Sequence, residues 1–282
     1  MSKTKSRIRE STLRYKHSLG QHFLYDEAIL AALVREAAVT EADDVLEIGP
    51  GCGSLTAPLC DAAGQVLAVE LDERLIPLLR GFLAEKKNLT LVQGDIMRQD
   101  LAALTEPLRK PFAVVANIPY YITTPLILRL LDSGLAFSRL ALMVQKEVAE
   151  KILSFPGEEG WGPLAIRCRY LCVPRMAMEV PAACFTPPPK VDSAFVVLTR
   201  REEPAVRVKS EEMLFRVAGA AFALRRKTML NNLCATFRAD RDQALGWMEK
   251  AGLDGKVRGE KLTLEELGAL ADVIAGEGER EA

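Results

Sequence analysis

The fold is decided by the stretch Val45-Leu46-Glu47-Ile48-Gly49-Pro50-Gly51-Cys52-Gly53-Ser54-Leu55-Thr56. Its apolar start predicts a buried strand over 45–48, its alternating glycines predict a tight turn, and its end predicts the start of a helix. Glycine permits positive φ and lets a ligand approach the backbone closely. The helix start adds free N–H groups and a positive dipole end. This order favours a loop that binds a nucleoside-type cofactor.

The glycine spacing narrows the choice of cofactor. The pattern Gly-x-Gly-x-Gly differs from the Gly-x-Gly-x-x-Gly of nicotinamide sites, and no Gly-Lys-Ser/Thr phosphate loop is present. Glu70 closes a second apolar run over 66–69, where a carboxylate can accept hydrogen bonds from a ribose diol. A tight strand–helix turn with a solvated glutamate is the alternative, and the motif alone leaves it open.

Apolar runs and helical patterns alternate along most of the chain, which predicts a doubly wound α/β sheet. Glu70, Asp95 and Asn117 each follow a different strand, so we expect them to converge over the carboxyl ends of the sheet. A later pair of runs predicts antiparallel strands at the sheet edge. The expected strands are 45–48, 66–70, 89–93, 112–116, 140–145, 173–180 and 194–198, and the expected helices of this part are 26–38, about 54–63, 72–86, 125–131, from 147 onward, and about 163–172.

Composition indicates an ordinary globular protein of 282 residues, 49% hydrophobic and 27% charged, with no apolar run long enough to span a membrane. The net charge is −1, but residues 1–20 carry +5, residues 214–238 carry +5 and residues 239–282 carry −5. Such asymmetry suggests a positive face that meets an anion. We predict a basic arm over 1–20, a catalytic domain over 21–203 and a helical domain over 204–282. Six cysteines without a Cys-x-x-Cys pair and two histidines argue against a metal site.

A second motif, Asn117-Ile118-Pro119-Tyr120, ends the fourth expected strand. The exocyclic amine of adenine is a poor nucleophile because its lone pair is delocalised. Oxygens of Asn117 and Ile118 could accept both amine hydrogens and draw the nitrogen toward tetrahedral geometry. Pro119 would hold the turn, and Tyr120 would stack on an extruded base. A strand-end turn with a buried tyrosine is the alternative for the tetrapeptide alone.

With both motifs in hand, most of 16–230 resembles the KsgA/RsmA family of rRNA adenine dimethyltransferases, within the wider S-adenosylmethionine-dependent class. Tyr121 stands where many members have Asn, a departure at the pocket rim. The resemblance implies a class I methyltransferase fold, which is a Rossmann-like doubly wound sheet with antiparallel edge strands, and a small all-α C-terminal domain. It is carried by Leu19-Gly20-Gln21-His22-Phe23-Leu24, Glu47-Ile48-Gly49-Pro50-Gly51, Val69-Glu70-Leu71-Asp72, Gly94-Asp95-Ile96, Asn117-Ile118-Pro119-Tyr120, Gln145-Lys146-Glu147-Val148 and Phe185-Thr186-Pro187-Pro188-Pro189-Lys190-Val191-Asp192-Ser193.

The resemblance also implies roles for individual residues. The cofactor S-adenosylmethionine would be bound by His22, Leu24, Gly49, Gly51, Glu70, Asp95, Ile96 and Asn117, and the target base by Asn117, Tyr120 and Phe185. Three bland alternatives stay open: a surface role for His22, a core role for Phe185 and a turn cap for Asp95. Arg225, Arg226 and Lys227, which we expect in a helix of the C-terminal domain, would contact RNA phosphates.

The implied function is dimethylation of N6 on two adjacent adenosines near the 3′ end of 16S rRNA, in the small ribosomal subunit or its precursor. We expect a cytoplasmic monomer without a membrane partner. Two alternatives remain: a large-subunit rRNA adenine methyltransferase of the macrolide-resistance type, and a mainly non-catalytic RNA-binding assembly or transcription factor on the same fold. The full Phe185–Ser193 stretch favours the small subunit, and the intact Glu70, Asp95, Asn117 and Tyr120 favour catalysis.

Overall fold

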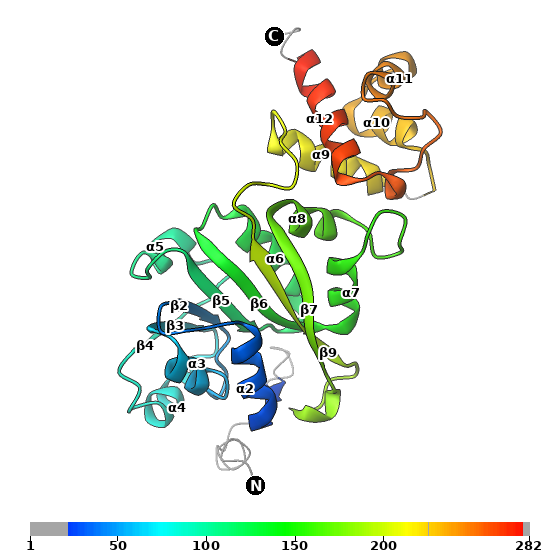
Figure 1. Ribbon diagram of the computed structural model, residues 1–282. Coiled ribbons are helices and arrows are strands. Elements are labelled where there is room, and N and C mark those ends of the chain that lie inside the picture. Colours follow the sequence, from blue (N-terminus) through cyan, green and yellow to red (C-terminus); the bar gives the residue numbers. More distant parts are fainter. Residues whose placement is uncertain (1–21, 225, 279–282) are drawn as a thin grey trace. The chain divides into compact units, whose positions relative to one another are not determined.

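The computed structural model describes residues 22–224 and 226–278 (Figure 1). It divides into two compact units, the first comprising residues up to Ala149 with Pro174–Arg200, and the second comprising Glu150–Val173 with the residues from Arg201 onward. The basic arm expected over 1–20 lies outside the described residues. Segment 150–173 groups with the C-terminal helices, unlike in the sequence-based division at 203. The functional limits 21–203 and 204–282 stay a prediction.

Among the described residues, seven strands form one sheet in the order β4-β3-β2-β5-β6-β9-β7 (Figure 1). The pairs β2–β3, β3–β4, β2–β5 and β5–β6 are parallel, and β9 pairs antiparallel with β6. This confirms the doubly wound sheet. The expected edge position holds for β7, whereas β9 lies between β6 and β7. The strands are β2 (Asp44–Ile48), β3 (Gln65–Glu70), β4 (Leu89–Gln93), β5 (Phe112–Asn117), β6 (Phe137–Gln145), β7 (Cys172–Val180) and β9 (Ser193–Arg200).

The strand order places a topological switch point at β2. The chain moves outward from β2 through β3 to β4 and then returns to the other side of β2 as β5. Ligands of open α/β sheets bind at such a point, over the carboxyl ends of the strands. The register places the carboxyl ends of β2, β3 and β5 side by side, because Ile48 pairs with both Val69 and Ala116. The residues next along the three strands, Gly49, Glu70 and Asn117, are therefore neighbours.

The first unit buries alternate residues of its strands against helices. Val45 of β2, Val66 of β3 and Val115 of β5 belong to one apolar cluster with Leu33 and Leu59 of two helices. Because side chains alternate across a strand, Glu47 faces the same side as Val45. The helices of the sheet region, including α5, which the sequence analysis missed, are α2 (Glu27–Glu36), α3 (Thr56–Ala62), α4 (Leu75–Phe82), α5 (Leu101–Thr105), α6 (Thr123–Asp132) and α7 (Lys146–Leu153), with short 3₁₀ turns at η2 (Tyr120–Ile122) and η3 (Ala182–Cys184).

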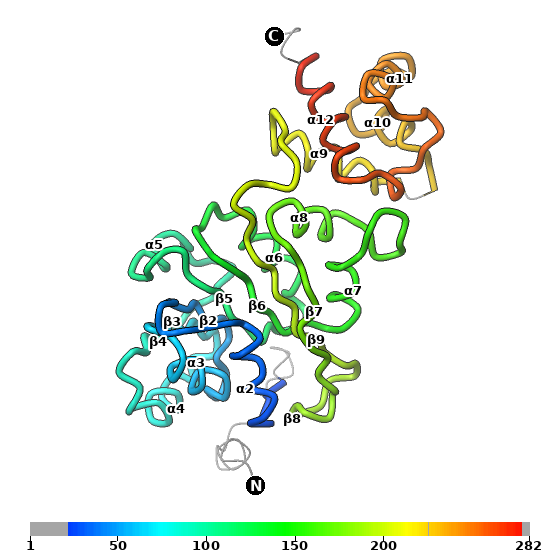
Figure 2. Tube along the Cα trace, viewed as in Figure 1, coloured from blue at the N-terminus to red at the C-terminus, as the bar shows by residue number. Residues whose placement is uncertain are grey.

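A small two-stranded sheet was also missed because each of its strands has only two residues. The strands β1 (Phe23–Leu24) and β8 (Phe185–Thr186) pair antiparallel, with Phe23 opposite Thr186 and Leu24 opposite Phe185 (Figure 2). Sequence periodicity carries no signal over so short a length. This pairing brings the N-terminal segment and the proline-rich stretch together beside the carboxyl ends of β2 and β5.

The second unit is helical, as its patterning predicts. Helix α9 contacts both α10 and α12, and the indole nitrogen of Trp161 donates to the carbonyl of Leu262 at 3.1 Å. Among the described residues, no helix is both long and apolar enough to cross a membrane. The elements of this unit are α8 (Pro163–Leu171), α9 (Glu211–Ala223), α10 (Met229–Phe237), α11 (Arg241–Lys250), η4 (Gly259–Lys261) and α12 (Leu264–Gly278).

Candidate active site

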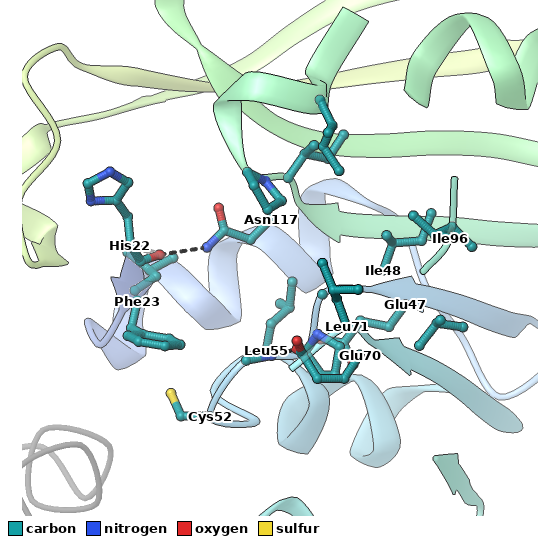
Figure 3. Close-up of a pocket in the computed structure, with 18 of the residues that line it drawn as sticks. His22, Phe23, Glu47, Ile48, Cys52, Leu55, Glu70, Leu71, Ile96 and Asn117 are labelled. Atoms are coloured by element: carbon teal, nitrogen blue, oxygen red, sulfur yellow. Dashed lines mark hydrogen bonds between the residues drawn. The ribbon is translucent and has the colours of Figure 1, made fainter. Parts of the chain in front are cut away.

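A pocket lies where β2, β3 and β5 end, as the switch point predicts (Figure 3). Its wall is built from the segments that follow these strands and β4, and from the N-terminal segment around β1. Phe185 is not among the residues that line it. The sequence-predicted residues that do line it are His22, Leu24, Gly49, Gly51, Glu70, Asp95, Ile96, Asn117 and Tyr120.

The backbone of the glycine-rich turn requires glycine at three alternate positions. Gly49, Gly51 and Gly53 have φ of 73°, 60° and 80°, in the left-handed region that side chains disfavour. A Cβ at Gly51 would also lie 2.8 Å from the ring of Phe23. A larger residue there would therefore strain the turn and displace β1. The glycines leave an open backbone cradle in the pocket wall, which suits a ligand that approaches the main chain.

Glu70 ties this turn to the end of β3. Its Oε2 accepts from the N–H of Gly51 at 3.0 Å and its Oε1 from the N–H of Asp72 at 2.8 Å. The residue is 6% exposed. Burial raises the pKa of Glu70, although the two N–H donors oppose this rise. Each carboxylate oxygen can accept a second hydrogen bond, so the group that holds the turn can also accept from a ligand.

Glu47 is a second carboxylate in the pocket wall, and the sequence analysis assigned it no role of its own. It is 1% exposed, and its Oε2 has no hydrogen-bond partner among the described residues. Burial raises the pKa of Glu47 to about 8, and the charge of Glu70 adds to the rise. A buried polar atom without a partner is rare in proteins. Glu47 is among the residues that line the pocket, whereas this orphaned oxygen is itself buried.

We expect the buried carboxyl of Glu47 to make folding stability pH-dependent. The folded state keeps the Glu47 proton up to its pKa of about 8, whereas the unfolded chain loses it near the ordinary glutamate pKa of 4.5. The folded state binds more protons between these values, so the free energy of unfolding falls as pH rises through this window. Glu47→Gln should remove this fall, which is on the order of 3 kcal/mol.

Urea titrations of wild type and Glu47→Gln at pH 5, 6.5 and 8 measure this effect. The stability difference between the two should grow toward pH 8 in favour of the Gln variant. Glu41→Gln, at an exposed carboxylate of the same unit, is the matched control and should run parallel to wild type. A Glu47→Gln curve that keeps a constant offset from wild type at every pH would contradict the assignment.

Asp95 and Ile96 follow β4 on the far side of the pocket. The Oδ1 of Asp95 accepts from the N–H of Met97 at 2.9 Å, and Arg98 lies 3.6 Å from its Oδ2. Asp95 therefore caps its own turn, which was the bland alternative, and also lines the pocket. Ile96 is buried and presents an apolar surface at the same place. A role for both residues toward an adenine ring stays a prediction.

Asn117 is the last residue of β5, and its amide orientation is fixed by the chain itself. Its Nδ2 donates to the carbonyl oxygen of His22 at 3.1 Å (Figure 3). A carbonyl can only accept, so the amide nitrogen must be the atom that faces His22. The Oδ1 of Asn117 is consequently free to accept a hydrogen bond from a group in the pocket.

Tyr120 is held in place on two sides. Its ring stacks on the His22 ring with centroids 5.6 Å apart, and its hydroxyl lies 2.6 Å from the Oγ of Ser193. Burial raises the pKa of Tyr120, so the phenol stays neutral. His22 is in turn anchored, because its Nδ1 donates to the carbonyl of Pro187 at 2.7 Å. The N-terminal segment and the proline-rich stretch therefore support the tyrosine together.

Phe185 differs from the expectation that it stacks on a target base. It is 2% exposed and belongs to the apolar cluster that includes Leu24 and Leu33. The reason is its place in β8, where antiparallel pairing sets it opposite Leu24. Phe185 therefore has the core position that the sequence left open as the alternative to base stacking. Stacking on a base would require the ring to leave the core.

Three residues of this region were given no individual role by sequence reasoning. Phe23 packs on Gly51, Leu71 is 42% exposed where it lines the pocket beyond Glu70, and Ser193 contacts Tyr120. All three stand inside motifs that carry the family resemblance, which was the available signal. The contacts of Phe23 and Leu71 depend on three-dimensional packing and leave no pattern in the sequence.

Arg226 and Lys227 of the basic run are not helical, in contrast to the expectation. Arg225 lies outside the described residues, and Arg226 and Lys227 are exposed in the connection between α9 and α10. Helix α10 begins after Thr228, whose side chain accepts from the N–H of Asn231. A threonine N-cap favours a helix start at that point and leaves Arg226 and Lys227 outside α10.

Comparison with known proteins finds a family whose profile matches this chain. The profile of the family described as ribosomal RNA adenine dimethylase matches residues 12–275. A protein of Streptococcus pneumoniae (serotype 2, strain D39) named ribosomal RNA small subunit methyltransferase A is 42% identical over 283 residues, covering 98% of each chain.

Two solved structures are similar to the whole fold. A dimethyladenosine transferase from Plasmodium falciparum superposes with a TM-score of 0.78 at 26% identity, covering 91% of this chain and 98% of that chain. The 23S rRNA methyltransferase ErmE superposes with a TM-score of 0.69 at 28% identity, covering 90% and 99%. Both similarities span the helical second unit as well as the sheet.

Proposed function

The chain belongs to the ribosomal RNA adenine dimethylase family, and on this premise we propose that it dimethylates N6 of two adjacent adenosines near the 3′ end of 16S rRNA in the small ribosomal subunit or its precursor. The observation that carries the proposal is the orientation of Asn117. Its donor atom is occupied by the His22 carbonyl, which leaves an acceptor oxygen in the pocket. Such an acceptor is what the amine of adenine requires when it attacks.

The pocket residues fit S-adenosylmethionine, which supplies an electrophilic methyl group on a sulfonium when bound. The open turn at Gly49 and Gly51 suits the methionine part. Glu70 would accept from the ribose hydroxyls. Asp95 would accept from the adenine amine, and Ile96 would pack against the ring.

The protein's own part in the reaction is positioning and hydrogen bonding. The target adenine must leave its stack to enter the pocket. Tyr120 offers it a ring that His22 and Ser193 already hold, so little freedom is lost on stacking. Asn117 Oδ1 accepts one amine hydrogen, and this bond strengthens as the nitrogen becomes positive. His22 and Leu24, which line the pocket on the β1 side, would cover the cofactor.

Methyl transfer to isolated ribosomal subunits tests the proposal. Small subunits from cells that lack the modification should accept up to four methyl groups from labelled S-adenosylmethionine, two on each adenosine. Large subunits should accept none. Label in the large subunit would favour the macrolide-resistance alternative, and tight binding of small subunits without label would favour a non-catalytic assembly role. The modified bases are mapped by digestion and mass spectrometry.

We predict that Arg226→Ala with Lys227→Ala weakens binding of the small subunit and flattens its salt dependence. Both side chains are exposed in the connection before α10. Each phosphate contact that is lost should reduce the log–log salt slope by about 0.9 on duplex RNA treated like B-DNA, and by less on single strands. Filter-binding titrations from low to moderate salt measure the slope.

Arg241→Ala with Lys256→Ala is the matched control for this prediction, because it removes the same charge from exposed positions of the same unit. An equal loss of slope in both pairs would mean that net charge matters and not the position of the run. An unaltered slope in the first pair would leave Arg226 and Lys227 as solvated residues. Arg225 belongs to the same predicted contact.

The partner and location follow from the substrate. A ribosomal RNA substrate supports a cytoplasmic enzyme. We also propose that the chain acts as a monomer, because one pocket with one set of residues is sufficient for sequential transfers. Light scattering of the free protein and of its complex with the small subunit measures the stoichiometry.

A further inference from the structure

The two tyrosines that follow Pro119 have opposite environments. Tyr120 is fixed between the His22 ring and the Ser193 hydroxyl. Tyr121 also lines the pocket but is 56% exposed. No hydrogen bond or ring contact joins Tyr121 to another residue in the part of the chain that the structure describes. Its aromatic face is therefore available to a ligand.

The backbone beneath Tyr121 is held firmly. Residues Tyr120–Ile122 form the 3₁₀ turn η2, in which the N–H of Ile122 donates to the carbonyl of Pro119 at 3.1 Å. Pro119 fixes its own φ, and α6 continues directly from Thr123. An exposed ring on a rigid turn loses little conformational freedom when it binds.

Exposed large aromatic side chains are scarce in this chain. Among the described residues, Tyr121 and Phe155 are the two large aromatic side chains that are exposed, and Phe155 belongs to the other unit. Among the described residues of the first unit, Tyr121 is therefore the one such ring, and it stands next to the residue proposed to hold the target base. This coincidence of exposure, rigidity and position points to a ligand with a flat face.

We propose that the Tyr121 ring is a second base subsite, on which the nucleobase adjacent to the adenine in the pocket stacks. This inference rests on the proposed function, which requires two neighbouring adenosines. A phosphodiester link keeps the neighbouring base close to the pocket mouth while its partner lies inside. Bases stack on aromatic side chains through their π-faces, and purines present the larger face. Tyr121 thereby holds one adenosine while the other reacts.

The test combines substitutions in the enzyme and in the RNA. Small subunits that lack the modification are prepared in two forms, one with the natural adenosine pair and one with the neighbour of the target replaced by uridine. Methylation of the remaining target is measured against subunit concentration for wild type, Tyr121→Ala, Tyr121→Leu and Tyr121→Phe. Val173→Ala, at an exposed apolar position outside the pocket lining, is the control.

With the adenosine pair, Tyr121→Ala and Tyr121→Leu should raise the half-saturating subunit concentration about 5- to 150-fold, the range of losses found when a base loses its stacking partner. With uridine as neighbour the loss should be clearly smaller. Uridine stacks more weakly on the ring, so the variants that lack the ring have less to lose. Tyr121→Phe keeps the ring and should stay within about twofold of wild type. Cofactor affinity of each variant, measured by calorimetry, should be unchanged and reports that the fold is intact.

The outcomes separate this inference from the proposed function. A wild-type enzyme that does not methylate the adenosine pair of the small subunit overturns both. If wild type is active, and Tyr121→Ala and Tyr121→Leu have the same half-saturating subunit concentration as wild type, only the second base subsite is overturned. An equal loss on both forms of the subunit also overturns it, because Tyr121 would then contact a protein or a distant part of the RNA.

Discussion

Asn117→Ala should slow methyl transfer by about 10²- to 10³-fold in a single turnover with saturating cofactor and small subunits, as expected for loss of one oriented polar contact to the reacting group. The side-chain oxygen of Asn117 can act as an acceptor in the pocket, because the amide nitrogen is the atom that donates to the His22 carbonyl. Its hydrogen bond to the adenine amine grows stronger as the nitrogen becomes positive. Such a contact lowers the barrier more than it aids binding.

The affinity for small subunits should therefore fall much less than the rate. Some loss of S-adenosylmethionine affinity is expected as well, because Asn117 also borders the cofactor part of the pocket and helps to hold His22. Rates are compared at saturation to remove this effect. A single-turnover rate near that of wild type would reduce Asn117 to a turn residue and remove the proposed activation of the amine.

Asn88→Ala is a matched control for this experiment. Its Nδ2 also donates to backbone carbonyls, those of Cys60 and Ala63, but Asn88 does not line the pocket. This variant should lower the melting temperature and leave the single-turnover rate unchanged. Tyr120→Phe should be mild, because it keeps the ring that stacks and loses only the contact with Ser193.

The sequence carried enough information for the sheet and for most of the pocket. The strands around Val45 and Val115 are apolar runs with clear boundaries, and the polar residues that end them had to meet at the switch point. Gly49, Glu70 and Asn117 could be placed together for this reason alone. Their family motif then allowed a role to be assigned to each.

What the sequence did not reveal depends on contacts between distant segments. The pairing of β1 with β8 involves two residues per strand, so it left no periodicity, yet it places Phe185 in the core and Phe23 on Gly51. The isolation of the Glu47 oxygen and the exposure of Tyr121 are equally invisible in the chain, because burial is a property of packing. The helix start at Thr228 was misjudged because the basic run shares the polarity of a helix face.

Glu70→Ala should weaken S-adenosylmethionine binding by about 1.5–3 kcal/mol, or roughly 10- to 150-fold, through loss of charge-assisted hydrogen bonds. The structure shows one task of this carboxylate, which is to hold the N–H groups of Gly51 and Asp72, and the proposal adds a second, which is to accept from a ribose. Small-subunit affinity should change little. Calorimetry with the cofactor measures the first effect and filter binding the second, and Glu73→Ala, at an exposed position of the same loop, is the control.

A chemical double-mutant cycle distinguishes the two tasks of Glu70. Wild type and Glu70→Ala are each titrated with S-adenosylhomocysteine and with its 2′-deoxy analogue. If Glu70 accepts from the ribose, removing the hydroxyl costs wild type affinity but costs the variant almost nothing, because the contact is already absent. If Glu70 only holds the turn, the two losses add. An unchanged cofactor affinity in Glu70→Ala would exclude both tasks, and would mean that the strand end tolerates two unpaired N–H groups because water reaches them.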